Sequence, residues 1–294
     1  MKTFHTLAGL VLLAIALLAP AVPVPAHAAQ SYDNCTGFID TLPATISTQG
    51  TWCLRHDLST AIVDGAAITI AANNVTIDCN DFKVGGLVAG AGTNAFGISA
   101  HGRFNTTVRN CNVRGFLYGI STDGGGGHLI EHNSLDSNTD TAIDVRSPGS
   151  TIRNNRVLDT GGSTVFTIGY AYGIAAFSGV DVLDNTVDGV AATPNGSGNA
   201  MAYGIYTYDN GDGNVSGNRV HGLVASGTGS TRGIYNNSSG RLIVRDNDVQ
   251  GSGVSGSIGV RCTNNLATTR DNVVAGFATG VQDCLSDGDT VNAN

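Results

Sequence analysis

Residues 97–120 read GISAHGRFNTTVRNCNVRGFLYGI, and this stretch contains the repeat that decides the fold. Gly97-Ile98 joins a small residue to a β-branched one, Cys111-x-Val113 follows, and Gly119-Ile120 begins the pattern again. Related copies recur roughly every 21 to 31 residues along the chain. Self-similarity at such a period is the sequence signature of a solenoid, in which each repeat forms one coil.

Two anchors define each coil. The first anchor occurs at Gly97-Ile98, Gly119-Ile120, Ala142-Ile143, Gly173-Ile174, Gly204-Ile205, Gly233-Ile234, Gly259-Val260 and Gly280-Val281. The second, Asn-x-Val or a near relative, occurs at Asn80-x-Phe82, Cys111-x-Val113, Asn133-x-Leu135, Asn155-x-Val157, Asn185-x-Val187, Asn218-x-Val220, Asn247-x-Val249 and Asn272-x-Val274. The leg from first to second spans 12 to 14 residues, whereas the return leg varies from 8 to 19. Insertions are therefore confined to one corner of the coil.

The residue types of the repeat favour an all-β fold. Each coil is expected to add short strands to parallel sheets, with neighbouring coils about 4.8 Å apart. One coil cannot bury its own Ile and Val side chains, but stacked coils form a continuous core. We expect the repeated Asn to adopt the left-handed conformation at a tight bend, with its amide hydrogen-bonded to the coils above and below. After residue 28, Lys83 is the only lysine and Glu131 the only glutamate, which disfavours helices.

Residues 1–28 are typical of a secretory signal peptide. Lys2 supplies the positive charge, residues 7–18 form an apolar run too short to span a bilayer, and Ala26-His27-Ala28 offers a cleavage site. We place cleavage before Ala29 and expect a secreted or periplasmic protein with no membrane span. The alternative is a retained membrane anchor.

The charge balance disfavours nucleic acid as a partner. Without Lys2, 14 basic residues face 23 acidic ones, whereas binding to phosphates requires clustered Lys and Arg. A strongly anionic polysaccharide would also be repelled, unless local arginines or a bridging cation offset the negative charge.

Six cysteines follow the signal segment, and an even count in an exported protein indicates disulfides. Cys79 and Cys111 fall on successive coils at nearly the same phase, as do Cys262 and Cys284. By elimination Cys35 pairs with Cys53. No spacing resembles a zinc site, and no cofactor is expected.

The segments VTIDCN (75–80), Gly97-Ile98 and TVRNC (107–111) resemble the pectate-lyase-like right-handed parallel β-helix superfamily over roughly residues 61–294. The resemblance implies a single-stranded right-handed solenoid but no particular chemistry, because the superfamily contains lyases, hydrolases, epimerases, esterases and non-enzymatic surface proteins. Residues 42–54 resemble the strand and turn that precede such solenoids. Residues 29–60 are therefore expected to form an N-terminal cap that Cys35–Cys53 staples.

Outward side chains of the strand after each Gly-Ile anchor should stack in columns. The first column is Ser99, Ser121, Asp144, Ala175, Tyr206, Tyr235 and Arg261, and the second is His101, Asp123, Arg146, Phe177, Tyr208, Asn237 and Thr263. The longest insertions, near residues 159–171, 189–202 and 222–231, enter the same sheet and are placed to wall it. In the resembled superfamily this sheet commonly forms the floor of a saccharide groove.

The polar half of these columns supplies the catalytic candidates Asp144, Arg146, Asp123 and His101. Carboxylates on adjacent coils can share a proton, and an arginine or histidine can assist acid–base chemistry. The alternative is that Arg146 forms ordinary surface ion pairs with Asp123 and Asp144.

The aromatic half supplies the candidates for substrate binding: Phe177, Tyr206, Tyr208, Tyr235 and Arg261. Flat rings at one-coil spacing suit the faces of sugars, although they suit one another equally. A further column precedes the Gly-Ile anchors and is expected to stack for structural reasons: Phe96, Tyr118, Tyr172 and Tyr203.

Residues 138–144, NTDTAID, are similar to the polygalacturonase motif Asn-Thr-Asp-Gly-Ile-Asp with one residue inserted. The paired aspartate that this family carries on the next coil is missing, because Ala175-Ala176-Phe177 stands there. Two hypotheses therefore stay open. One is an exported polysaccharide-active enzyme, lyase- or hydrolase-like, and the other is a non-catalytic glycan-binding, adhesive or structural cell-surface module.

The remaining signals are few. Residues 209–213, DNGDG, superficially resemble a calcium loop but lack the glutamate and helices of an EF-hand. The expected partner is a polysaccharide or a cell-surface glycan, and the sequence leaves the oligomeric state open.

Overall fold

The computed structural model describes residues 32–193, 199–209, 212–238, 240–263 and 265–292. The chain divides into residues 1–32 and a compact unit of residues 33–294, which contains all the strands described here. The signal peptide expected over residues 1–28 lies outside the described residues.

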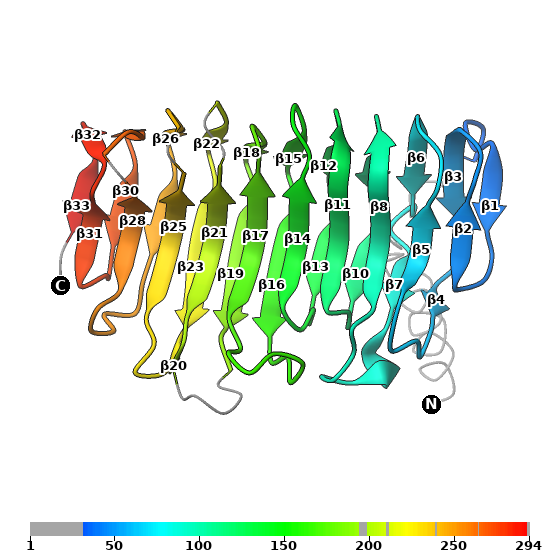
Figure 1. Ribbon diagram of the computed structural model, residues 1–294, viewed down its shortest axis with the longest axis horizontal. Coiled ribbons are helices and arrows are strands. Elements are labelled where there is room, and N and C mark those ends of the chain that lie inside the picture. Colours follow the sequence, from blue (N-terminus) through cyan, green and yellow to red (C-terminus); the bar gives the residue numbers. More distant parts are fainter. Residues whose placement is uncertain (1–31, 194–198, 210–211, 239, 264, 293–294) are drawn as a thin grey trace, which may run out of the picture. The chain divides into compact units, whose positions relative to one another are not determined.

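Three parallel sheets make up this unit, and each coil contributes one strand to each sheet (Figure 1). Sheet A contains β1 (Gly37–Ile39), β3 (Gly50–Leu54), β6 (Val75–Asp78), β9 (Thr107–Arg109), β12 (Leu129–Glu131), β15 (Thr151–Arg153), β18 (Asp181–Leu183), β22 (Asn214–Ser216), β26 (Ile243–Arg245), β29 (Thr268–Arg270) and β32 (Leu285–Asp287). Sheet B contains β2 (Ala44–Ile46), β5 (Ala66–Ile70), β8 (Phe96–Phe104), β11 (Tyr118–Gly126), β14 (Thr141–Arg146), β17 (Ala171–Phe177), β21 (Ala202–Tyr208), β25 (Thr231–Asn237), β28 (Ile258–Cys262) and β31 (Thr279–Gln282). The predicted all-β parallel solenoid is confirmed.

Sheet C completes each coil. Its strands are β4 (Leu58–Ser59), β7 (Lys83–Gly85), β10 (Asn112–Arg114), β13 (Ser134–Asp136), β16 (Arg156–Gly161), β19 (Thr186–Ala191), β23 (Arg219–Val224), β27 (Asp248–Gln250), β30 (Val273–Ala275) and β33 (Thr290–Asn292). The corner loops between sheets C and B carry the short 3-10 helix η1 (Leu87–Ala89) and an antiparallel pair, β20 (Asn199–Ala200) with β24 (Ser226–Gly227).

The core is a stack of aligned β-branched side chains. In sheet B the register pairs Ile98 with Ile120 and then Ile143, and the series continues to Val260. Each member of this series is at most 1% exposed. Burial on both sides by neighbouring coils supplies the hydrophobic free energy that a single coil lacks.

The glycine of the first anchor is required by close packing against the second anchor. A Cβ added at Gly204 would collide with Cγ1 of Val220 in the same coil and with the carbonyl oxygen of Gly233 in the next. Gly233 meets the equivalent pair, Val249 and Gly259. The two anchors therefore recur together because each valine fills the space that the missing side chain leaves.

The second anchor forms a buried ladder of amides. Oδ1 of Asn185 accepts from the backbone nitrogen (2.9 Å) and Nδ2 (3.0 Å) of Asn155, while Nδ2 of Asn185 donates to the Ile152 carbonyl (3.0 Å). The same bonds join the members Asn133, Asn155, Asn185, Asn218, Asn247 and Asn272. The ladder begins at Cys111, whose nitrogen donates to Asn133, and ends at Asp289.

Two details of the sequence prediction are wrong. The ladder asparagines are not themselves left-handed, because the residue before each one takes that conformation, as Asn154 (φ 54°) and Asp184 (φ 54°) do. In the first full coil the second anchor was also misplaced. Two left-handed residues, Asn80 and Asp81, follow Cys79, so Val84 rather than Phe82 aligns with Val113.

Three disulfides link neighbouring coils or the first strands, as predicted: Cys35–Cys53, Cys79–Cys111 and Cys262–Cys284. Near the N-terminus, strands β2, β3 and β4 already pair with β5, β6 and β7 respectively, so all three sheets have begun by residue 59.

Among the described residues, no helix has the length and apolar character needed to traverse a bilayer.

Replacing Asn185 by alanine is expected to lower the free energy of unfolding by about 3 kcal/mol, because buried donors of Asn155 lose their acceptor. Urea unfolding followed by circular dichroism measures this change. The control is Asn94→Ala, at an exposed position, which should shift stability by less than about 0.5 kcal/mol. Equal effects at the two positions would contradict a structural role for the ladder.

Candidate functional site

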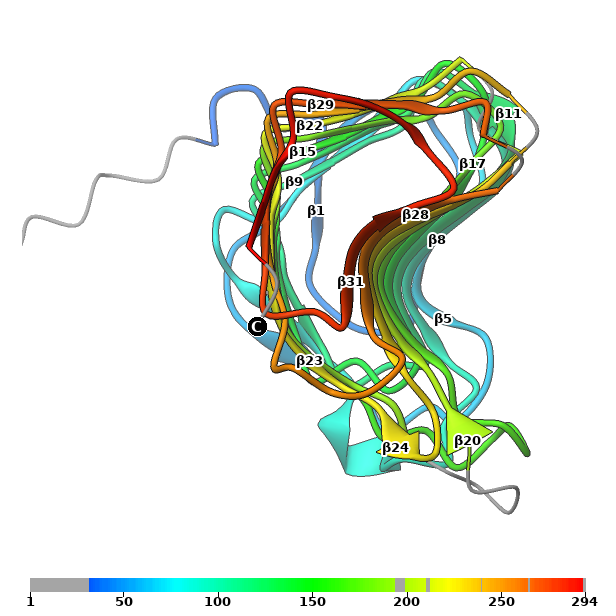
Figure 2. The same ribbon diagram turned by 90° about the vertical axis from the view of Figure 1, so that its left-hand side faces the viewer.

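Sheet B presents the hollowed side of the solenoid. Seen along the stack in Figure 2, its strands bend inward, while sheets A and C enclose the other sides. The corner loops gather beside this face, at the end of the section where β20 and β24 are labelled. Backbone hydrogen bonds link these loops to one another. The Thr164 nitrogen donates to the Ala91 carbonyl (3.0 Å), and Gly169 forms an isolated antiparallel β-bridge with Thr193. The predicted wall of insertions is therefore present beside sheet B.

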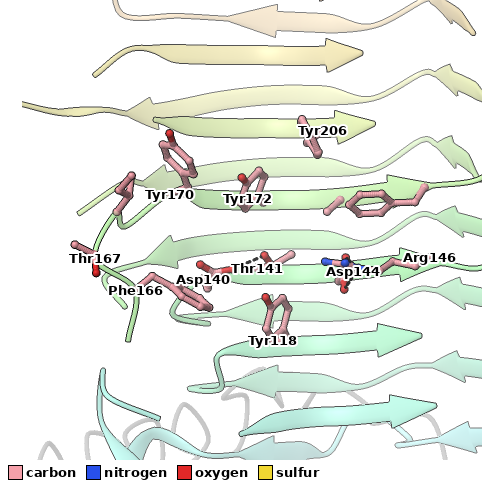
Figure 3. Close-up of a pocket in the computed structure, with 13 residues that line it drawn as sticks. Tyr118, Asp140, Thr141, Asp144, Arg146, Phe166, Thr167, Tyr170, Tyr172 and Tyr206 are labelled. Atoms are coloured by element: carbon pink, nitrogen blue, oxygen red, sulfur yellow. Dashed lines mark hydrogen bonds and ion pairs between the residues drawn. The ribbon is translucent and has the colours of Figure 1, made fainter. Parts of the chain in front are cut away.

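A pocket of about 480 Å³ opens between sheet B and this wall (Figure 3). Its lining residues are Tyr118, Asp140, Thr141, Asp144, Arg146, Phe166, Thr167, Ile168, Tyr170, Tyr172, Ala175, Phe177 and Tyr206. A second hollow of about 200 Å³ extends toward the N-terminal coils and shares Tyr118, Asp144 and Arg146. The two hollows together form one groove along sheet B.

Asp144 and Arg146 lie on the floor of the groove, where β14 ends. Nε of Arg146 donates to Oδ2 (3.0 Å) and Oδ1 (3.1 Å) of Asp144. Asp144 is only 3% exposed, so the expected surface ion pair is in fact half-buried. Burial raises the pKa of Asp144 to about 6, although the charge and hydrogen bond of Arg146 act to lower it.

Asp140 is the second buried carboxyl of the pocket. It stands just before β14, is 5% exposed, and accepts a hydrogen bond from the Thr141 hydroxyl (2.8 Å). Burial raises the pKa of Asp140 to about 6; the Thr141 bond lowers it, and the neighbouring charge of Asp144 raises it further. Perturbed carboxyls that face the same pocket are the usual mark of a functional site.

The motif around Asp140 explains why this residue faces the pocket. Oδ1 of Asn138 accepts from the Phe116 nitrogen (3.2 Å), and its Nδ2 donates to the Val113 carbonyl (3.1 Å). Thr139 is likewise bonded to the backbone of the preceding coil. Asn138 and Thr139 are thus structural, and only Asp140 is presented to the groove.

His101 and Asp123 lie in the smaller hollow with Asp144 and Arg146. Their atoms Nδ1 and Oδ2 are 3.6 Å apart, and their side chains are 83% and 56% exposed. The four catalytic candidates therefore share one groove, but Asp123 lies beside His101 and forms no ion pair with Arg146. An exposed pair of this kind contributes little stability.

Aromatic rings cover the next coils of the groove. Tyr206 lies among its neighbours, with ring centroids 6.1 Å from Phe177, 5.4 Å from Tyr172 and 5.6 Å from Tyr235. Tyr208 lies 5.9 Å from Phe177, and the Arg146 guanidinium lies 4.6 Å above the Phe177 ring. The predicted binding rings therefore form one cluster, which begins where the acidic residues end.

The column before the Gly-Ile anchors stacks as expected and also lines the pocket. Phe96 stacks on Tyr118 (5.1 Å) and Tyr172 on Tyr203 (4.9 Å), while Thr141 interrupts the series. Tyr118 and Tyr172 nevertheless face the groove. Burial raises the pKa of Tyr118 to about 12, so its hydroxyl stays protonated and can donate to a ligand.

Sequence reasoning missed several lining residues, namely Tyr118, Asp140, Tyr172 and the loop residues Phe166, Thr167, Ile168 and Tyr170. Asp140 had a signal, because it belongs to the NTD triplet. The loop residues had none beyond their place in an insertion.

In the part of the chain that the structure describes, no three His, Cys, Asp or Glu side chains are grouped to hold a metal ion. The loose calcium-loop resemblance at residues 209–213 includes Asn210 and Gly211, which lie outside the described residues.

Three parallel sheets in coil order, a continuous aliphatic core and a walled groove define a parallel β-helix protein. The sequence profile of the family described as right handed beta helix region matches residues 59–201 and, in an overlapping match, residues 96–274. The chain therefore belongs to that family, and its helix is right-handed. No curated protein sequence matches the chain significantly.

Solved structures show the same fold. XylC, determined in complex with xylose, has a TM-score of 0.51 at 12% identity, covering 74% of this chain and 38% of its own. The Dettilon tailspike protein has a TM-score of 0.53 at 14% identity, covering 87% of this chain and 54% of its own. This chain thus spans well under two thirds of either protein, and the likeness concerns the fold.

Replacing Asp140 by asparagine is expected to stabilise the protein at neutral pH. The folded-state pKa of about 6 exceeds the ordinary value of 3.8. The native state therefore binds more protons between these values, and wild-type stability falls as pH rises through them. Asparagine does not titrate and so removes this loss. The free energy of unfolding of the variant, relative to that of wild type, should therefore rise by about 2 kcal/mol from pH 4 to pH 7. Urea unfolding at both pH values measures the gain, and a gain that does not change with pH would refute the assignment.

Proposed function

We propose that the chain binds a polysaccharide along the groove of sheet B and hydrolyses it at Asp140 and Asp144. The observation that carries this proposal is the pocket itself, where two buried carboxyls face aromatic rings. Ring faces stack on the apolar faces of sugars, and a pair of carboxyls is the usual catalytic device for glycosidic bonds.

The electrostatics assign a role to each carboxyl. Near pH 6, pKa values of about 6 let one group hold a proton while the other is ionised. Because the two charges interact, the protons leave the pair in coupled steps. Arg146 favours the charged form of Asp144, so Asp144 serves as the base or nucleophile. Asp140 forms no ion pair with a described residue and feels the charge of Arg146 without a hydrogen bond to it, so Asp140 serves as the acid that protonates the leaving oxygen.

A non-catalytic glycan-binding module is the second candidate. Both oxygens of Asp144 are already engaged by Arg146, and the coil that follows carries Ala175 and Phe177 where a further acid would stand. In this case the rings alone hold the glycan, and the carboxyls only contribute hydrogen bonds.

The proposal includes export from the cytoplasm. Three disulfides suit an oxidising compartment. The apolar run of residues 7–18 and the site before Ala29 would direct and then release the chain. Sequencing the N-terminus of protein recovered from the culture medium checks the cleavage position.

Activity on a panel of plant and bacterial polysaccharides, scored by new reducing ends and by absorbance of unsaturated products, tests the enzymatic proposal. Asp140→Asn and Asp144→Asn should each lower turnover by about 10²-fold or more, because each removes an acid–base group. Asp248→Asn, on the exposed face of sheet C, is the matched control and should keep full activity.

Glycan retention by affinity electrophoresis separates binding from catalysis. Tyr206→Ala is expected to weaken retention about tenfold, since the ring lies at the centre of the aromatic cluster. Retention that depends on Tyr206 without any turnover would favour the non-catalytic module. If wild-type protein neither retained nor cleaved any glycan, both candidates would fail.

A further inference from the structure

Two arginines without acidic partners lie beyond the aromatic cluster on sheet B. Arg232 belongs to β25 and Arg261 to β28, the next strand of the sheet. Eight arginines among the described residues form ion pairs with carboxylates. Of the five described arginines that form none, Arg232 is the buried one, and Arg261 lies beside it in the next strand. In this strongly acidic chain, an unpaired cationic pair therefore needs an explanation.

Arg232 is buried and held in place. It is 8% exposed, and its Nη1 donates to Oγ of Ser230 (2.7 Å) and to the carbonyls of Thr231 (3.0 Å) and Gly256 (2.8 Å). All three acceptors are neutral, so the positive charge has no counter-charge. Nε of Arg232 is buried without any hydrogen-bond partner, and the same holds for Nε of Arg261. Unsatisfied buried donors are rare in folded proteins and cost free energy.

The two guanidinium groups also repel each other. Burial lowers the pKa of Arg232, and the positive charge of Arg261 lowers it further. Packing like charges in a partly buried site without a counter-ion is unfavourable, and attraction to a bound anion would offset that repulsion. Arginine is also the side chain whose planar donors best match a carboxylate or a sulfate.

Aromatic rings surround this cationic pair. The Arg261 guanidinium lies 5.4 Å from the centre of the Tyr235 ring, and Tyr235 stacks at 5.9 Å on Tyr203, the partner of Arg232 in the neighbouring strand. Aromatic rings that can stack on a sugar face therefore lie directly beside cations that can bind an acidic substituent of the sugar.

The register sets the distance from this pair to the acidic site. Asp144 aligns in turn with Ala175, Tyr206, Tyr235 and Arg261. Four strand steps of about 4.8 Å separate Asp144 from Arg261, or about 19 Å along sheet B. A ligand that spans both ends must be an oligosaccharide of several units.

We propose that Arg232 and Arg261 form an anion subsite that binds the carboxylate or sulfate ester of an acidic glycan extending from the groove along sheet B. This inference rests on the proposed function and names its substrate class. It also explains how a chain with a net charge of −8 accepts an anionic polymer: the negative group meets the cationic pair, away from Asp123, Asp140 and Asp144. The side-chain rotations common on ligand binding would bring Nε into contact with the anion.

Titration with three small sugars, followed by the arginine Nε–Hε NMR signals, tests the subsite directly. D-glucuronate and D-glucose 6-sulfate carry the two anionic groups, and D-glucose carries neither. The Nε signals of Arg232 and Arg261 should shift saturably with one or both acids and not with glucose. The acid that binds with the higher affinity identifies the anionic group that the subsite prefers.

Variants complete the test. Arg261→Gln should weaken binding of the preferred acid at least tenfold, while Arg270→Gln, which removes an equal charge on sheet A, should leave it unchanged. Because Arg232 is buried, its replacement carries a risk of unfolding, and the wild-type titration and Arg261→Gln do not depend on it.

The outcomes separate this inference from the proposed function. Acids that leave both Nε signals unmoved, or equal losses in the two variants, would overturn the anion subsite. If glycans were still retained through Tyr206 in that case, the proposed function would stand with a neutral substrate. If both Nε signals shifted but no polysaccharide was cleaved, the anion subsite would be supported and only the hydrolytic step of the proposed function would be contradicted.

Discussion

The amide ladder fixes the alignment of successive coils, and every other feature of the protein depends on that alignment. From Asn133 to Asn247, each side chain bonds to the next amide and to a backbone carbonyl of the coil before; Asn272 bonds to the carboxylate of Asp289 instead. A coil shifted by one residue would break these buried bonds and turn the aliphatic side chains outward. The ladder thus holds residues far apart in sequence in fixed columns.

Because the coils are aligned, the chemical character of the outward side chains on sheet B changes stepwise along the solenoid. Along sheet B, acidic residues end at β14, aromatic rings cover β17 and β21, and the arginine pair stands on β25 and β28. The Gly–Val packing that closes each coil leaves the same strand free to vary outward. Along one strand, the inward residues are therefore constrained by core packing, while the alternate outward residues can differ from coil to coil.

Most of the fold could be predicted from the sequence, because the leg between the two anchors has nearly constant length and its residues are buried. Cys79–Cys111 and the alignment of Asp144 with Tyr206 follow from that spacing. Tyr118 was not assigned to the site, because the bend at Gly119 turns both Gly119 and Ile120 inward and leaves Tyr118 facing out. Phe166 lies in an insertion, whose path depends on contacts with other loops such as Thr164 to Ala91.

We propose that a glycan lies along sheet B, with one sugar between the carboxyls and the rings. A crystal structure of the Asp140→Asn variant soaked with an acidic oligosaccharide tests it most directly. Electron density is expected along sheet B, with a sugar ring against Tyr172 or Tyr206 and an anionic substituent near Arg261. Density confined to sheet A or sheet C, with the groove of sheet B empty, would contradict it.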